Sequence, residues 1–171
     1  MSLIGASRRE SEKGVGIGSD RVEWEMKNGT HFYIFNTATL GSGDELWMKL
    51  VVPANKHIRL RWNIGSTGAV DTKFYKDADG FGTGTAKTIY NSKVSSSSPN
   101  SGCTMEAHTS APSTLGTQID GAIWGTRRVG GSQDKDEGLI LTEGTYCRYI
   151  KSGDNSNRIT MKAYWSEHNN E

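Results

Sequence analysis

The stretch KHIRLRWNIG, residues 56–65, alternates apolar and polar side chains without a break. Every second residue from Ile58 to Ile64 is apolar, and every second residue from His57 to Asn63 is polar or charged. Successive side chains of a β-strand point to opposite faces, so this pattern predicts a strand with one buried face and one solvated face.

Segments of similar character lie on both sides of this stretch. They are rich in β-branched and aromatic residues and are separated by turn residues such as Gly, Asn and Pro. The expected strands are residues 21–29, 31–40, 45–52, 69–77, 85–90, 103–108, 118–129, 136–142, 145–152 and 158–167. We expect 136–142 and 145–152 to pair as a hairpin across a tight turn at Glu143 and Gly144.

Short strands at this spacing are typical of a sandwich or a barrel. The mixture of long and short connections favours a Greek-key arrangement, and the fold class that we predict is an all-β, jelly-roll-like antiparallel β-sandwich. The chain has 171 residues, which suits one domain. We assign residues 31–171 to the sandwich and residues 1–30 to an extended N-terminal arm that is flexible or becomes ordered on a partner.

The charge balance argues against a nucleic-acid or membrane partner. The chain carries 20 basic and 19 acidic residues, for a net charge of +1. The two adjacent arginine pairs, Arg8–Arg9 and Arg127–Arg128, are more typical of a solvated surface than of a phosphate-binding stripe. No apolar run reaches the 18 or so residues of a transmembrane helix, and the first residues lack the apolar core of a signal peptide. We therefore expect a soluble product made in the host cytoplasm.

The sequence offers no catalytic or cofactor-binding constellation. Its four histidines have no second His or Cys at metal-ligand spacing, and no serine lies in a nucleophile motif. Cys103 and His108 are five residues apart on one expected strand, which places them on opposite faces. Cys103 and Cys147 form a disulfide or remain two free thiols. We therefore expect no enzyme activity, no metal and no cofactor.

The tryptophans divide by strand parity. Trp62 and Trp165 share the inward positions of their strands and are expected in the core. Trp47 falls on the opposite face from Leu46 and Met48, which predicts an outward side chain in a subunit interface or a sugar-binding surface. Trp24, on the expected strand 21–29, is a second candidate contact for a partner.

The order of segments resembles small structural proteins of tailed bacteriophages. The residues that carry the resemblance are the run LGSGDELWMKLVVPANKHIRLRWNIGSTGAVDTKFYKDADGFGTGT, the loop YNSKVSSSSPNSG and the final GTYCRYIKSGDNSNRITMKAYWSEH, within residues 29–168. The terminal Trp165-Ser166-Glu167-His168 departs from the Trp-Tyr-Glu-His that the family pattern implies.

This resemblance implies a capsid decoration or cement protein on the outer surface of the virion head. Its partners would be the major capsid protein and further copies of itself, commonly in a trimer, with no nucleic acid or membrane. Arg8, Arg9, Trp24 and Trp47 are the interface residues that we predict. The first alternative function is a receptor- or carbohydrate-binding tip of a tail fibre or spike. A cupin-type enzyme is a third and more remote alternative.

Overall fold

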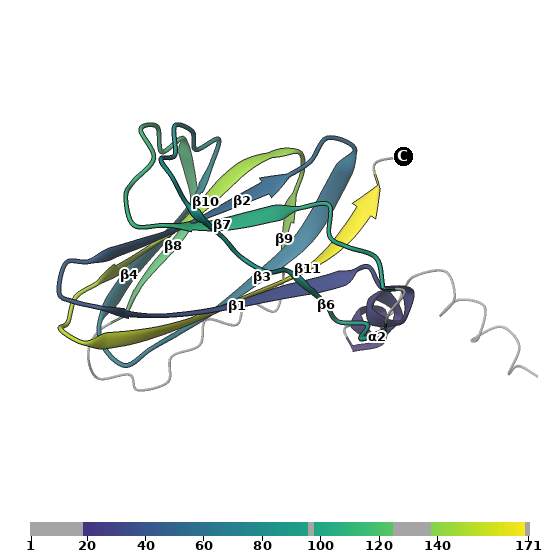
Figure 1. Ribbon diagram of the computed structural model, residues 1–171, viewed down its shortest axis with the longest axis horizontal. Coiled ribbons are helices and arrows are strands. Elements are labelled where there is room, and N and C mark those ends of the chain that lie inside the picture. Colours follow the sequence, from purple (N-terminus) through teal and green to yellow (C-terminus); the bar gives the residue numbers. More distant parts are fainter. Residues whose placement is uncertain (1–18, 96–97, 125–137, 170–171) are drawn as a thin grey trace, which may run out of the picture.

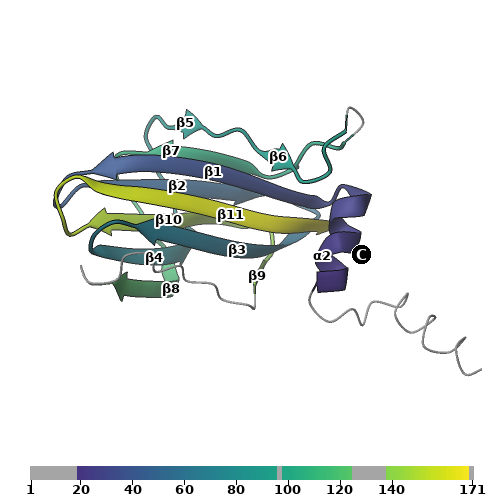
Figure 2. The same ribbon diagram turned by 90° about the horizontal axis from the view of Figure 1, so that it is seen from below.

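The protein is described by a computed structural model for residues 19–95, 98–124 and 138–169. Within these residues, two antiparallel sheets form a sandwich, with one helix, α2 (Ser19–Asn28), at its end (Figures 1 and 2). Sheet A has the strand order β6 (Tyr90–Asn91), β1 (His31–Leu40), β11 (Asn157–Asn169), β3 (Lys56–Ser66), β9 (Leu139–Leu141). Sheet B has the order β5 (Thr85–Ala86), β7 (Thr104–His108), β2 (Glu45–Val52), β10 (Gly144–Ser152), β4 (Val70–Lys76), β8 (Thr117–Trp124).

The strand pairing is that of a jelly roll. β1 pairs with β11, β2 with β10, β3 with β9, and β4 with β8, all antiparallel. The first half of the chain is therefore folded against the second half in reverse order, as in one long hairpin rolled into two sheets. β5, β6 and β7 lie in the long connection between β4 and β8 and extend the edges beside β2 and β1. The predicted fold class is confirmed.

The main core lies between the sheets and is built from alternate residues of the strands. Ile58, Leu60, Trp62 and Ile64 of β3 are all buried, as their alternation predicted. Trp165 of β11 is buried in the same core. The guanidinium of Arg148 lies there too, 4.9 Å from the ring of Phe74, with an Nη2 to Oδ2 distance of 3.4 Å to Asp120 on the edge strand β8.

Two expectations about local structure are wrong. Residues 21–29 form most of helix α2 rather than a strand. Residues 136–142 and 145–152 do not form a hairpin, because β9 joins sheet A beside β3 while β10 lies between β2 and β4 in sheet B. The single strand expected at 85–90 is also divided, since β5 belongs to sheet B and β6 to sheet A.

The two cysteines are free and buried on opposite faces of sheet B. Cys103 belongs to the main core, whereas Cys147 lies in a second apolar cluster with Trp47 and Tyr149. Burial raises the pKa of both thiols, that of Cys147 to about 12, so neither is a reactive thiolate near neutral pH.

We expect Trp62→Ala to lower the free energy of unfolding by about 3–5 kcal/mol, because a buried indole is replaced by a cavity. Trp62 is 8% exposed and meets Phe74 edge-on at 6.0 Å between ring centroids. Urea denaturation followed by circular dichroism measures the change. Ile140→Ala, at an exposed position of β9, is the control and should shift the midpoint little. A neutral Trp62→Ala would contradict the burial of this side chain.

Candidate functional site

The structure separates the four predicted interface residues. Trp24 is 60% exposed on helix α2, whereas Trp47 is only 4% exposed. Arg8 and Arg9 lie outside the described residues. Of these four, Trp24 alone is placed by the structure where a partner can reach it.

Trp47 has the predicted parity, but the expectation that its side chain is accessible is wrong. Its side chain does lie on the face of sheet B away from the main core, but that face is covered by the loop after β4. Trp47 packs 4.5 Å from the ring of Tyr149, and Ala78 and Phe81 of the loop join the same cluster. Its Nε1 donates a hydrogen bond to Glu45 at 3.2 Å. A strand can be apolar on both faces when both are covered.

Helix α2 is held against sheet A by a buried acid, Glu25. Glu25 is 3% exposed, and its carboxylate accepts a hydrogen bond from the Ser166 hydroxyl of β11. The second oxygen, Oε1, lies 3.6 Å from Nε2 of His168. The neighbours of Glu25 on the helix, Trp24 and Met26, are exposed. The helix thus buries a charged side chain and exposes two apolar ones, whereas an amphipathic helix would bury its apolar residues.

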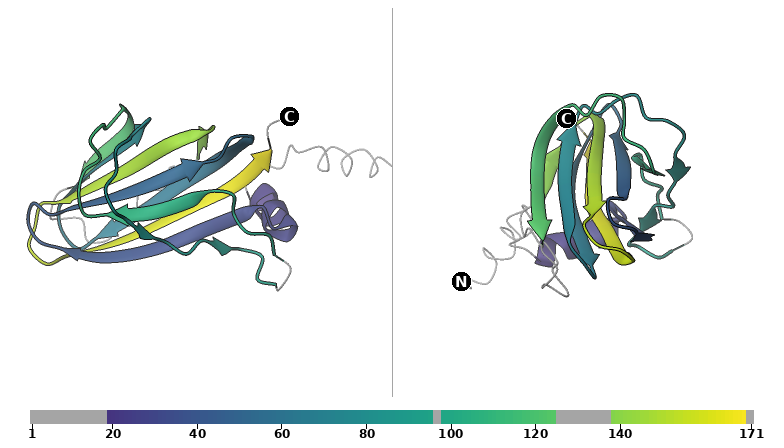
Figure 3. Two further views of the ribbon diagram at one scale, coloured as in Figure 1. Left: turned by 45° about the horizontal axis from the view of Figure 1, so that its top comes forward. Right: turned by 90° about the vertical axis from the view of Figure 1, so that its left-hand side faces the viewer.

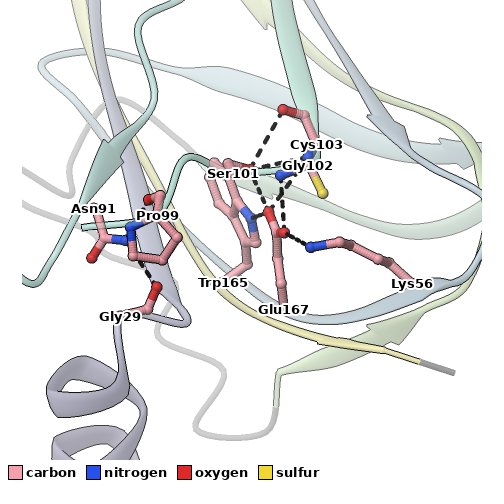
Figure 4. Close-up of polar contacts among 9 residues, drawn as sticks. All are labelled: Gly29, Lys56, Asn91, Pro99, Ser101, Gly102, Cys103, Trp165 and Glu167. Atoms are coloured by element: carbon pink, nitrogen blue, oxygen red, sulfur yellow. Dashed lines mark hydrogen bonds and ion pairs between the residues drawn. The ribbon is translucent and has the colours of Figure 1, made fainter. Parts of the chain in front are cut away.

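The C-terminal end of the helix is fixed by a glycine. Gly29 has φ +72°, the left-handed conformation that ends many helices, and its N–H donates to the Met26 carbonyl at 3.0 Å. A Cβ at this position would meet Pro99 at 2.9 Å. The side-chain amide of Asn91 donates to the carbonyls of Gly29 and Pro99, both at 2.8 Å (Figure 4). The connection between β6 and β7 is therefore tied to the helix end.

A second buried carboxylate, that of Glu167, fixes the other end of this connection. It accepts hydrogen bonds from Lys56 at 2.7 Å, from the N–H of Gly102 at 3.0 Å and from Trp165 Nε1 at 3.1 Å, as well as from the Ser101 hydroxyl (Figure 4). Burial alone would raise the pKa of Glu167, but these donors outweigh it and lower the pKa to about 2. Glu167 is therefore ionised at all physiological pH values.

These contacts build an open groove of about 870 Å³ beside the helix. Helix α2, which carries Glu25, and the end of β11, which carries Glu167, lie at the same end of the sandwich (Figure 3). The rings of His57 and His168 stack in the groove at 5.3 Å between centroids. The groove is lined by aromatic, cationic, anionic and amide side chains. Its lining residues are Trp24, Gly29, Thr30, Phe32, Lys56, His57, Pro99, Asn100, Glu167, His168 and Asn169.

Few features of the sequence indicate which residues position this groove. Glu25 is one of several acids in a polar segment, and Lys56 begins a strand whose polar face is solvated. Glu167 does lie in the terminal Trp-Ser-Glu-His that contributed to the phage resemblance. The motif draws attention to Glu167 but does not indicate that its carboxylate is buried and ionised.

The described residues contain no group of three or more His, Cys, Asp and Glu side chains arranged to hold a metal ion. In the same ranges, no helix has the length and apolar character needed to cross a membrane.

No protein-family model matches the chain, and no curated protein matches it either. Two solved structures align over most of its length. A decameric BFDV capsid protein shares 7% identity, with 80% of this chain and 97% of that chain covered and a TM-score of 0.16. An unassembled KI polyomavirus VP1 pentamer shares 10% identity, with 81% and 75% covered and a TM-score of 0.15. TM-scores this low support no conclusion about function.

We expect Glu167→Gln to destabilise the protein at neutral pH by about 3 kcal/mol, the free energy that corresponds to lowering a pKa from 4.5 to about 2. Because the folded-state pKa is depressed, this stabilisation is present above pH 4.5 and is lost as the pH falls toward 2. The difference from the unmodified protein should therefore shrink in acid. Denaturation curves from pH 7 to pH 2.5 measure it.

Glu143→Gln, at an exposed position before β10, is the matched control and should change stability little at any pH. A Glu167→Gln protein as stable as the unmodified protein at pH 7 would contradict the role assigned to this carboxylate.

Proposed function

We propose that this protein is a virion structural protein that decorates a capsid by binding the major capsid protein on the outer surface of the head. The jelly roll is a fold of viral capsid domains, although lectins and cupins share it. The sequence resemblance to small structural proteins of tailed bacteriophages points to the first of these classes. Near-zero net charge suits a protein that functions through surface burial rather than by binding nucleic acid.

The observation that carries the proposal is the exposed indole of Trp24 on a rigidly held helix. Two contacts of Glu25 with β11 and the glycine stop at Gly29 fix the helix, so Trp24 is held in place at the mouth of the groove. A large aromatic side chain that is already ordered costs little conformational entropy on binding, and tryptophan is enriched among residues that dominate binding energy.

Binding of this kind would stabilise the assembled lattice by mass action. A protein that binds the assembled capsid and not its free subunits shifts the equilibrium toward assembly. Many copies per particle, linked as oligomers, would add avidity. We expect homo-oligomers for this reason, and an interface of about 1,600 Å² in total would be of ordinary size for such attachment.

We expect Trp24→Ala to weaken attachment to heads by at least tenfold, with an unchanged fold, because it removes the aromatic anchor and little else. Purified protein is co-sedimented with phage heads that lack it, and the copies bound per capsid are counted across a concentration series. Saturation at a fixed ratio to the lattice supports decoration.

Ile123→Ala, which truncates an exposed apolar side chain on β8 far from the groove, is the matched control and should bind like the unmodified protein. Absence of binding by the unmodified protein would reject decoration. If Trp24→Ala bound heads as tightly as the unmodified protein does, Trp24 would not be part of the interface.

A second candidate function, a receptor- or carbohydrate-binding tip, is favoured by a row of tyrosines on the outer face of sheet A. Tyr33 stacks with Tyr90 at 5.4 Å and lies 6.3 Å from Tyr164 between ring centroids. Tyr90, at the edge of the row, is 48% exposed, so one ring remains available to a sugar. A glycan array read with the unmodified protein and with Tyr90→Ala tests this: binding that Tyr90→Ala loses supports a lectin role, and no binding rejects it.

A further inference from the structure

The edge of sheet A beside β1 is filled over only part of its length. β6 pairs with Phe32 and Tyr33, next to helix α2 (Figure 2). For the rest of β1, residues 34–40, the described parts of the chain supply no strand on the side away from β11. This leaves an edge about seven residues long, which is enough for an ordinary strand to pair with.

The hydrogen-bond pattern shows which backbone groups this edge presents. The Ser92 N–H donates to the His31 carbonyl on the β6 side, and the Glu167 N–H donates to the Thr30 carbonyl on the β11 side, both at 2.9 Å. Because these directions alternate along an antiparallel strand, odd-numbered residues face the β6 side. Phe35, Thr37 and Thr39 therefore direct their N–H and C=O groups into the open edge.

Sheet B extends beyond this edge and limits what can fill it. β7 and β5 continue sheet B past β2, whereas sheet A stops at β1 over the same stretch. Four apolar residues on the elements that flank this open position are only partly buried against the core: Ala38 and Leu40 of β1, Ile89 between β5 and β6, and Ala107 of β7. A second sandwich placed edge to edge would collide with β7. A single strand beside β1 would lie opposite β7 and cover these side chains.

This edge also lacks the features that normally prevent pairing. Residues 34–40, IFNTATL, contain no charge and no proline, and Phe35 is 51% exposed. Exposed edges are usually protected by lysine, proline, bulges or very short strands. Other edge strands do have such protection: β5, β6 and β9 have two or three residues, and β8 pairs with β4 through a register shift.

We propose that this edge receives residues 2–7 of a second copy of the chain, so that neighbouring copies are joined by exchanged N-terminal strands. The segment SLIGAS is uncharged and about as long as the open edge. As a strand it would place Ile4 and Ala6 on one face, where they can cover Ala38 and Ala107. Residues 8–18 span up to roughly 36–40 Å when extended, which is sufficient to reach a neighbour.

The direction of helix α2 indicates that the segment paired with the β1 edge comes from a second copy rather than from the same chain. Val22 and Met26 lie over β3, beside Arg59 and Asn63, whereas Gly29 leads into β1. The helix therefore begins two strands away from the β1 edge of its own sheet A. In Figure 2 the helix starts on the β3 side of sheet A and ends on the β1 side, where Gly29 leads into β1.

The test compares three proteins by light scattering after size exclusion: the full chain, a chain without residues 1–7, and Thr37→Pro. Proline removes one N–H from the open edge without removing a bond to β11, and Thr37→Ala is its matched control. We expect the full chain and Thr37→Ala to be oligomers, and the truncated chain and Thr37→Pro to be folded monomers by circular dichroism.

Mixing the truncated chain with Thr37→Pro should restore association as a pair, because one supplies the intact edge and the other the intact segment. If Thr37→Pro does not fold, Phe35→Asp serves instead, since a charge at the edge opposes pairing. A monomeric full chain, an unchanged oligomer after truncation, or a mixture that stays monomeric would each overturn the proposal.

A fluorescent peptide of residues 1–8 gives an independent readout. It should bind the truncated chain at least tenfold more tightly than it binds Thr37→Pro, and the same peptide with Ile4→Lys should not bind. Equal binding to both proteins would count against the β1 edge.

These outcomes are separable from the proposed decoration of a capsid. A truncated, monomeric protein that still co-sediments with heads supports strand exchange and leaves decoration intact. A truncated protein that keeps its oligomeric mass but no longer sediments overturns strand exchange and assigns the segment to capsid binding.

Discussion

The buried carboxylate of Glu167 is the constraint on which the α2 end of the molecule depends. An ion this deeply buried is tolerated only when it is fully solvated by donors, and β3, the connection before β7 and Trp165 supply them. Its neighbours Ser166 and His168 point to the other face of β11 and contact Glu25 of the helix. Three consecutive residues of one strand thus hold the loop on the inner side and the helix on the outer side.

This arrangement explains why a short polar helix can present an exposed tryptophan. A ten-residue helix in water is marginal on its own, and most helices of this size are held by an apolar face. Here the attachment is polar, through Glu25, so the indole of Trp24 is not needed for packing and remains exposed. The helix holds in place the tryptophan that we propose as a contact, without using it for stability.

The sequence predicted the sandwich well because alternation directly reports a half-buried strand, as at residues 56–65. It failed where tertiary contacts override local pattern. Val22, Trp24 and Met26 alternate with charged residues as in a strand, yet the segment is a helix because Glu25 is the residue that docks. Trp47 had outward parity, but the loop carrying Ala78 and Phe81 covers that face. The turn at Glu143 and Gly144 has hairpin chemistry but connects two sheets, which local sequence does not specify.

The pairing of the first strand with the last has a consequence for synthesis in the cell. β11 is the central strand that joins β1 and β3, and it is the last of the strands in the chain. While the ribosome is still making residues 157–169, β1 and β3 lack their common neighbour, and sheet A lacks its central strand. The nascent chain must therefore keep two apolar, strand-forming segments without their common partner until residues 157–169 have been made. The pairing that completes sheet A is non-local, and pairing of this kind slows folding and lengthens the time for which apolar strands are exposed.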